Sequence, residues 1–290
     1  MTENQNVKST PIIGIIGMGW VGKSYANAFR SRGVSPICYS IEPEYSRNKE
    51  AIKDCDIVLI AVPTPTTHNG IDDSILHDVI KLVGKGRIAL IKSTIIPGTT
   101  NSLQEANPEV IVIHSPEFLS VVSADHDASY PKRNIIGLPQ MNMKYNNAAS
   151  LLLSILPEAP FTTVCSAIEA EVIKYAHNCG GYLRIVFHNL LYDICKNMGG
   201  DWEKVKTAMA AEPNNLTAYL NPVHKNGRGA GGPCFIKDFS AFSTFYETLG
   251  DSLGSEMLKA IEAKNISLLE NSGKDLEILS SIYSEEVKSI

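Results

Sequence analysis

The chain lacks the features that mark membrane, secreted or nucleic-acid-binding proteins. No apolar run approaches the roughly 20 residues that span a bilayer, and Met1 to Thr10 is polar, without a signal-peptide core. No lysine or arginine run occurs and the formal net charge is -5, so no electrostatic footprint for DNA or RNA is present. We therefore expect a cytoplasmic protein whose partners include neither nucleic acid nor membrane.

The chain is also poor in cysteine and has no internal repeat or low-complexity segment. Its 6 cysteines, in 290 residues, are irregularly spaced and form no metal-type pairs, which indicates reduced thiols and predicts no metal site. With 44% hydrophobic and 20% charged residues, the chain can bury a full core in one large or two modest domains.

The first half alternates short apolar runs with helical patterns. Trp20 to Arg32 has helical spacing and stops at Gly33, between the first two of several runs rich in Ile and Val. This alternation predicts an α/β fold, with a doubly wound parallel-sheet (Rossmann) domain over residues 1–165 and right-handed crossovers. The predicted strands are 11–16, 36–40, 56–62, 87–92, 110–114 and 134–137.

Strand-like runs nearly vanish after Cys165, which predicts a mostly α-helical second domain over residues 166–290. The predicted helices are 167–197, 201–211, 238–249 and 255–271. Between two of them lies a loop, Pro213 to Pro233, rich in Asn, Gly and Pro, that leads to Cys234. Loops of this length in compact domains tend to be functional.

Cys234 lies in a tight Gly-Pro turn where a helical pattern begins, with Lys237 and Asp238 close behind it. Thiols attack as thiolates, and a cation or a helix N-terminus lowers the thiol pKa from about 8.5. The other cysteines occur in apolar periodic segments, where a thiol is usually a small buried hydrophobe, so we take them as core. These surroundings favour a functional thiol at Cys234 over a structural one.

A glycine segment between the first strand and the first helix predicts a dinucleotide site. Its glycines allow a tight turn and the close approach of a pyrophosphate to the helix N-terminus. Ser40, at the end of the second strand, replaces the acidic residue that usually holds the ribose. NAD is therefore the default cofactor; NADP is an alternative, because Ser40 with Arg47 nearby would accept a 2′-phosphate, whereas Glu42 could restore the carboxylate. The predicted loop is Gly17, Met18, Gly19, Trp20, Val21 and Gly22.

Several motifs, taken in order, resemble those of the UDP-glucose/GDP-mannose dehydrogenase family. They span nearly the whole chain, and their order makes the match more specific than any one motif. They are the glycine segment, Val62-Pro63-Thr64-Pro65, Lys92 to Thr99, Ser115-Pro116-Glu117-Phe118-Leu119, Pro131-Lys132-Arg133 and Gly231 to Asp238.

The resemblance implies an NAD-dependent, two-step oxidation of a sugar primary alcohol to a carboxylate. Cys234 would capture the aldehyde as a thiohemiacetal, and the second hydride transfer would give a thioester that water hydrolyses. Lys174 and Asn178, at i, i+4 spacing on one helix face, match a lysine and an asparagine that would stabilise an oxyanion. Asp238 matches a carboxylate that would orient groups or accept a proton near the thiol, or else cap a helix. Thr94 and Glu117 match residues that would position water for the hydrolytic step.

The predicted cofactor contacts extend beyond the glycine loop. Lys237 is included among them, although its charge could serve the thiolate, the substrate or only the surface. The further predicted contacts are Ser40, Pro63, Thr64, Thr94 and Lys237.

The sequence also departs from the family pattern. Val121 stands where the family has a second glutamate, Ser115 replaces an asparagine, and Ile236 replaces a proline. Nothing after Asn271 resembles the third, nucleotide-sugar-binding domain of the family, and the rest has room for one helix. We therefore expect a short form that keeps the chemical centre but not the usual recognition of the nucleotide.

Three functions remain open. We favour a compact dehydrogenase of the nucleotide-sugar type, acting on a sugar nucleotide or a sugar-like alcohol, with specificity from the loop 213–233 or a neighbouring subunit. A two-electron β-hydroxyacid dehydrogenase shares the two-domain plan and a Lys-x-x-x-Asn helix but needs no cysteine. A non-catalytic nucleotide-binding or assembly protein is the third. The resemblance alone implies a homodimer around the helix 255–271 and, by association, a role in polysaccharide biosynthesis.

Overall fold

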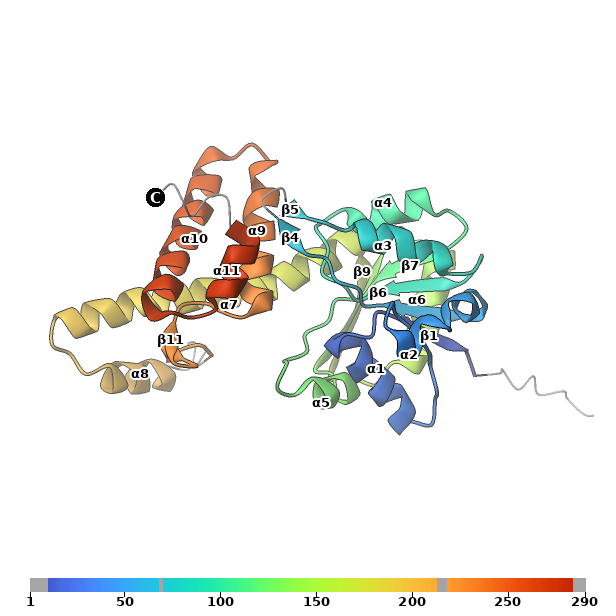
Figure 1. Ribbon diagram of the computed structural model, residues 1–290, viewed down its shortest axis with the longest axis horizontal. Coiled ribbons are helices and arrows are strands. Elements are labelled where there is room, and N and C mark those ends of the chain that lie inside the picture. Colours follow the sequence, from blue (N-terminus) through green and yellow to red (C-terminus); the bar gives the residue numbers. More distant parts are fainter. Residues whose placement is uncertain (1–9, 68–69, 213–217, 284–290) are drawn as a thin grey trace, which may run out of the picture. The chain divides into compact units, whose positions relative to one another are not determined.

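The computed structural model describes residues 10–67, 70–212 and 218–283 (Figure 1). Contacts divide the chain into two compact units, Met1–Thr64 with Asp73–Lys174, and Pro65–Asp72 with Tyr175–Ile290. Helix α7 (Ala167–Asn197) contributes its first turns to the first unit and its remainder to the second. The domain boundary between residues 165 and 166 stays a prediction.

A seven-stranded sheet forms the centre of the first unit, in the order β2-β1-β3-β6-β7-β8-β9. All of the predicted strands are confirmed, but β8 pairs antiparallel with β7 through His114 and Gly137, so the sheet is mixed rather than wholly parallel. Strand β9, which pairs in parallel with β8, was not predicted, because its edge position leaves Phe161 and Thr162 exposed and no apolar run forms. The strands are β1 (Ile13–Ile16), β2 (Ile37–Tyr39), β3 (Ile57–Ile60), β6 (Ile88–Ile91), β7 (Ile111–His114), β8 (Arg133–Leu138) and β9 (Phe161–Ser166).

Helices cover both faces of this sheet, which confirms the doubly wound class (Figure 1). Ile15 and Leu59 pack toward one set of helices and Ile16 and Val58 toward the other, as the alternation of side chains along a strand requires. The first face carries α1 (Trp20–Ser31), α5 (Ala124–Ser129) and α6 (Met143–Ile155). The second carries α3 (Ser74–Val79), α4 (Thr99–Ala106) and the 3-10 segments η1 (Lys49–Asp54) and η2 (Ile80–Leu82). A short helix, α2 (Pro43–Ser46), follows β2.

The second unit is mostly helical, as predicted. Its core includes Tyr182 stacked on Phe239, with ring centroids 3.9 Å apart. Besides α7, the unit contains α8 (Trp202–Ala211), α9 (Pro233–Glu247), α10 (Ser252–Ser272), α11 (Leu276–Tyr283) and the hairpins β4 (Thr66–Thr67) with β5 (Gly70–Ile71) and β10 (Val223–His224) with β11 (Gly227–Arg228). Helix α11 lies in the segment for which one helix was expected, of which the structure describes residues 275–283. None of the helices in the described ranges is long and apolar enough to cross a membrane.

Helix α9 begins at Pro233, earlier than the predicted start at Asp238. Proline is well suited to the first helical position, because it needs no hydrogen bond from its backbone nitrogen there. Cys234 therefore lies in the first turn of the helix rather than before it, and the interpretation of Asp238 as a helix cap is wrong, since Gly232 occupies the N-cap.

The cysteines predicted to be core fall into two groups. Cys38, Cys55 and Cys179 are buried, as expected, whereas Cys165 and Cys195 are only half-buried. Cys165 lies on the edge strand β9, where one side of the strand has no neighbour. The prediction of burial is thus wrong for these two residues.

Candidate active site

The glycine loop lies between β1 and α1. Strand β1 has β2 on one side and β3 on the other, so the chain crosses from one side of β1 to the other after β2. Gly17 has a φ of 90°, and a Cβ there would lie 2.4 Å from the carbonyl oxygen of Ala61. A Cβ at Gly22 would lie 1.9 Å from the carbonyl oxygen of Gly17, so no larger residue fits either position. The edge at which parallel strands reverse their order is where open α/β sheets bind dinucleotides.

The N-terminus of α1 fits the diphosphate of such a cofactor. It has no side-chain cap and no acidic residue in its first turn, and the space beside Gly19 is open. Free N–H groups and the helix dipole favour an anion at this place. Met18 instead packs its side chain into the core, while Trp20 is 38% exposed.

The ribose position after β2 is acidic despite the serine. The Ser40 hydroxyl donates to the Glu42 carboxylate at 2.6 Å, which brings a carboxylate to the place where one usually binds the ribose hydroxyls. A negative charge there repels a 2′-phosphate. The arrangement favours NAD over NADP.

The other residues predicted to contact the cofactor in the first unit gather at the carboxyl ends of β3 and β6. The Thr64 hydroxyl donates to the Thr94 carbonyl oxygen at 2.7 Å, and the Ser93 hydroxyl donates to the Val62 carbonyl oxygen at 2.8 Å. These bonds tie the two neighbouring strand ends together. Pro63, which stands between Val62 and Thr64 in the sequence, is exposed at the same edge of the sheet.

Glu117 and Lys174 form a buried ion pair within the first unit. The Lys174 ammonium donates to the Glu117 carbonyl oxygen at 2.7 Å and to its Oε1 at 3.0 Å. Glu117 Oε2 accepts from the Leu119 N–H at 2.8 Å. The two residues are 7% and 4% exposed, so the charges are shielded from water and depend on each other.

A second buried lysine, Lys92, opens the motif Lys92 to Thr99, and the sequence alone predicts no role for it. Its ammonium donates to the Ser115 hydroxyl at 2.9 Å and lies 4.7 Å from the centre of the Tyr25 ring. Burial lowers the pKa of Lys92 to about 7; Glu117 opposes this change and Lys174 adds to it. Ser115, which replaces the family's asparagine, is thus the partner of a buried lysine.

The second unit holds Cys234 and the residues that follow it. Cys234 is half-buried in the first turn of α9. The Asp238 carboxylate, on the same helix and 1% exposed, accepts from the Asn178 amide at 2.5 Å, and its Oδ1 lies 2.9 Å from the Lys237 ammonium. Its charge is therefore compensated by a cation and an amide, and Lys237 serves this carboxylate.

The two candidate oxyanion donors are each held by a carboxylate. Lys174 bonds to Glu117 in the first unit, and Asn178, one turn later on α7, bonds to Asp238 in the second. Within the described ranges there is no group of three or more His, Cys, Asp or Glu residues that could hold a metal ion.

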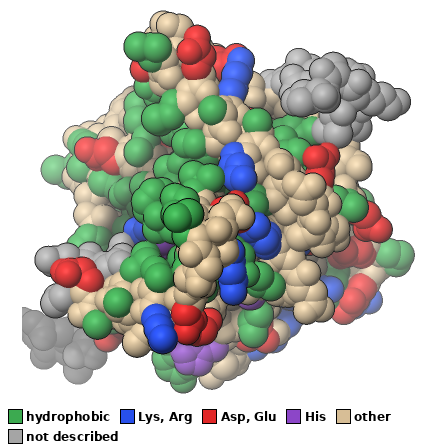
Figure 2. Space-filling view, turned by 90° about the vertical axis from the view of Figure 1, so that its left-hand side faces the viewer, with side chains coloured by type: hydrophobic (Ala, Val, Ile, Leu, Met, Phe, Trp, Pro, Cys, Tyr) green, Lys and Arg blue, Asp and Glu red, His purple; other side chains and the backbone are tan. Residues whose placement is uncertain are grey.

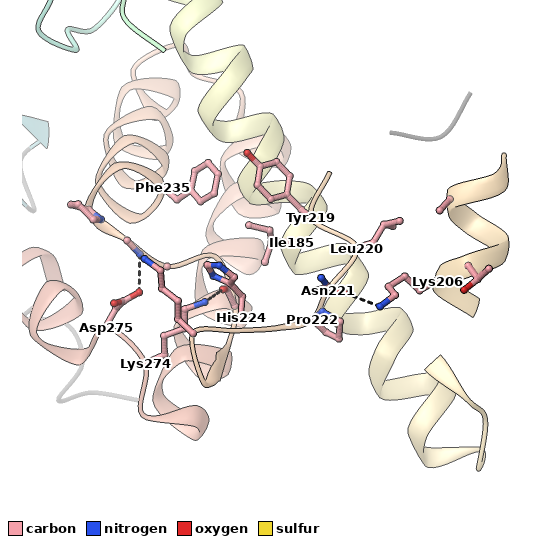
Figure 3. A pocket seen from close by; sticks show the side chains of 17 residues that line it. Ile185, Lys206, Tyr219, Leu220, Asn221, Pro222, His224, Phe235, Lys274 and Asp275 are labelled. Atoms are coloured by element: carbon pink, nitrogen blue, oxygen red, sulfur yellow. Dashed lines mark hydrogen bonds between the residues drawn. The ribbon is translucent and has the colours of Figure 1, made fainter. Parts of the chain in front are cut away.

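A cavity of about 700 Å³ lies in the second unit, beside the turn that leads to Cys234 (Figure 3). Much of its wall comes from the predicted specificity loop, whose residues 213–217 lie outside the described ranges. The lining combines aromatic with basic side chains and includes both neighbours of Cys234, though not Cys234 itself. These residues are Tyr219, His224, Lys225, Pro233 and Phe235, with Lys206 and Lys274 from neighbouring elements.

Both units match domains of one protein family. Residues 44–153 match the UDP-glucose/GDP-mannose dehydrogenase family, NAD binding domain, and residues 168–267 match its central domain. NAD is thus the cofactor that both the family match and the geometry of the first unit support.

Individual proteins agree with this match. A UDP-glucose 6-dehydrogenase of Rickettsia bellii is 27% identical over 225 residues, which cover 74% of this chain and 50% of the relative. The structure of a UDP-glucose dehydrogenase from Pyrobaculum islandicum has a TM-score of 0.77 and 27% identity, covering 89% of this chain and 69% of the other. The chain thus spans about half the length of the first of these relatives.

The same fold occurs in a second group of dehydrogenases. The 3-hydroxyisobutyrate dehydrogenase of Mycobacterium tuberculosis has a TM-score of 0.71 over 96% of this chain and 99% of its own, at only 13% identity, which shows a shared fold alone. The two domain matches cover both units of the chain, and the fold agrees with them. The chain belongs to the UDP-glucose/GDP-mannose dehydrogenase family.

Proposed function

We propose that the protein oxidises the primary alcohol of a sugar nucleotide to a carboxylate, with NAD as the hydride acceptor. The observation that carries this proposal is the position of Cys234 in the first turn of α9. The start of a helix favours the thiolate, and a thiolate is the form that attacks a carbonyl carbon. A dehydrogenase that only interconverts alcohol and ketone has no need of such a group.

The reaction balances in four steps. Loss of a hydride from carbon and a proton from oxygen turns the alcohol into an aldehyde. The Cys234 thiolate adds to the aldehyde carbon, whose oxygen takes up a proton, to give a thiohemiacetal. Loss of a second hydride and that proton gives a thioester, and water then breaks the carbon–sulfur bond to release the carboxylate and the thiol. The cofactor supplies the two-electron acceptor in each oxidation.

The buried polar residues take up the charge that these steps create. We propose that Lys174 and Asn178 stabilise the oxyanion, because an ammonium and an amide in a dry site are strong donors to a developing negative charge. Glu117 and Thr94 would position the hydrolytic water. Asp238, already bonded to Asn178, would orient that amide and exchange protons near the thiol.

The cavity of the second unit supports a nucleotide-sugar substrate. A diphosphate group carries negative charge, and Lys206, Lys225 and Lys274 line the cavity. Tyr219 and Phe235 offer aromatic faces on which a base or a sugar can pack. Because Pro233 also lines it, a molecule bound there would lie next to the cysteine turn.

Counting reduced cofactor tests the proposal directly. With UDP-glucose, and with a panel of other sugar nucleotides and simple hydroxy compounds, we expect one substrate to yield two molecules of NADH and one of the acid. One NADH per substrate would favour the β-hydroxyacid type of reaction. Cofactor binding without reduction for every alcohol would favour a non-catalytic protein.

We propose further that the protein is a homodimer through its second unit; the expectation that the helix 255–271 (within α10) lies at the dimer's centre stays a prediction. Phe187, Leu190 and Ile194, on one face of α7, are 56%, 42% and 62% exposed, and hydrophobic side chains gather on one face of the protein (Figure 2). Burying such a stripe against a second copy removes apolar area from water. Light scattering should give about twice the chain mass of 31.6 kDa, and Ile194→Glu should halve it. A wild-type mass of one chain would contradict the dimer.

A cytoplasmic location and a role in polysaccharide biosynthesis stay predictions.

A further inference from the structure

After the short β10–β11 hairpin, in which Arg228 pairs with Val223, side chains supply hydrogen bonds to the segment that leads to Cys234. The Asn265 side chain, on α10, accepts from the Ala230 N–H at 2.7 Å and donates to the Ala230 carbonyl oxygen at 3.0 Å. The Ser272 hydroxyl accepts from the Arg228 N–H at 2.9 Å. The backbone of residues 228–230 is thus fixed along α10.

The turn between α10 and α11 continues this pattern up to the cysteine. The Lys274 ammonium donates to the Gly229 carbonyl oxygen at 2.8 Å, and the Asp275 carboxylate accepts from the Gly232 N–H at 2.8 Å. Figure 3 shows Asp275 beside this backbone, with a dashed line joining the two. Gly232 is the N-cap of α9. The carboxylate therefore holds the residue at which the cysteine helix begins.

The Asp275 carboxylate and the Lys274 side chain occupy the space that a side chain at Gly231 would need. A Cβ at Gly231 would lie 2.0 Å from Asp275 Oδ2 and 2.7 Å from Lys274 Cε. Asp275 itself has a φ of 54°, a left-handed conformation that aspartate and asparagine adopt more readily than most residues with a side chain.

Helix α11 fixes Asp275 from the other side. The Asp275 carbonyl oxygen accepts from the N–H groups of Ile278 and Leu279, both at 3.1 Å. Leu279 belongs to an apolar cluster with Ile236, which stands in the first turns of α9. Residues 233–235 are therefore bracketed by the Asp275 hydrogen bond before them and by the packing of α11 after them.

We propose that Asp275 is a positioning residue for Cys234: its carboxylate fixes the start of α9 and so the place of the thiol. The proposal rests on the proposed role of Cys234 as the nucleophile. Pro233 has no N–H, so the Gly232 N–H is the last backbone donor before Cys234 that can anchor the turn. A nucleophile displaced by about 1 Å can lose about 10²-fold in rate.

Two variants of Asp275 separate the hydrogen bond from other effects. Asp275→Asn keeps an acceptor and tolerates the left-handed backbone, whereas Asp275→Gly keeps the backbone conformation and removes the acceptor. With UDP-glucose and NAD, we expect Asp275→Gly to lower kcat by about 10- to 100-fold at an unchanged KM for NAD, and Asp275→Asn to stay within about threefold of wild type.

Measurements without substrate test the same geometry. In Asp275→Gly, amide exchange over residues 231–236 and alkylation of Cys234 by iodoacetamide should both speed up severalfold, and in Asp275→Asn neither should change. Asp251→Gly is the matched control, because it removes a carboxylate that caps α10 through the Gly254 N–H, away from the cysteine turn. That variant should lose stability without a change at Cys234.

The inference is overturned if Asp275→Gly leaves exchange and alkylation at wild-type rates, or if kcat stays within about twofold while the turn loosens. It is also overturned if Asp275→Asn behaves like Asp275→Gly, because charge rather than the hydrogen bond would then be responsible. Failure of the proposed function shows separately, as acid formation that survives the loss of Cys234.

Discussion

Replacing Cys234 with alanine will stop formation of the carboxylic acid, with a rate loss of about 10³-fold or more, because no other group can carry the thioester. The aldehyde supplied directly should also remain unoxidised. The measurement is the yield of acid and of NADH per substrate at matched enzyme concentration. Cofactor binding, which we propose takes place at the glycine loop of the first unit, should be unchanged.

Cys195→Ala provides the matched control for this variant. Cys195 is also half-buried in the second unit, but it lies on α7 rather than in the first turn of a helix. We expect wild-type rates of acid formation from it. Undiminished acid formation by Cys234→Ala would disprove the thioester route and leave the β-hydroxyacid type of reaction as the better explanation.

The central strands were predictable because a strand that is buried on both faces of the sheet consists of a continuous run of apolar residues. Residues 57–60 and 88–91 are such runs, and every residue in them is buried. Strand β9 carries no such signal, since Phe161, Thr162 and Val164 are exposed at the sheet edge. A strand with a free edge is recognised from the strand that pairs with it, here β8, and not from its own residues.

The start of α9 was misjudged because its first residues are those of a turn. Gly231, Gly232 and Pro233 predict a loop when they are considered one by one. In the structure, Gly232 takes a φ of 80° as the N-cap and Pro233 opens the helix. The local sequence is compatible with a loop and with a helix that begins at Pro233. In the observed helix, Ile236 packs against α10 and α11.

The candidate site was predictable where a motif is local and not where contacts are distant. The glycine loop needs only neighbouring residues, so its pattern identifies it. Asp275 bonds to Gly232 across 43 positions, and no spacing rule joins the two. Lys92 and Ser115 likewise meet only because β6 and β7 are neighbours in the sheet.

The second large effect is expected at Lys174. Lys174→Met should lower kcat by about 10²- to 10³-fold, through loss of an oxyanion donor. It should also lower the free energy of unfolding by about 3–5 kcal/mol, because the buried Glu117 carboxylate loses its cation. Steady-state kinetics and urea denaturation measure the two losses.

A second substitution separates these two losses, since both follow from one side chain. In Lys174→Met with Glu117→Gln, no uncompensated charge remains at this pair, and the glutamine oxygen can still accept from the Leu119 N–H. Stability should therefore return most of the way. The kcat of the double variant should stay well below that of Glu117→Gln alone, which measures the loss of the proposed water-positioning role, because the ammonium is still absent. If activity returned together with stability, Lys174 would act only by holding the fold. If Lys174→Met alone kept kcat within about threefold of wild type, the oxyanion role would be wrong.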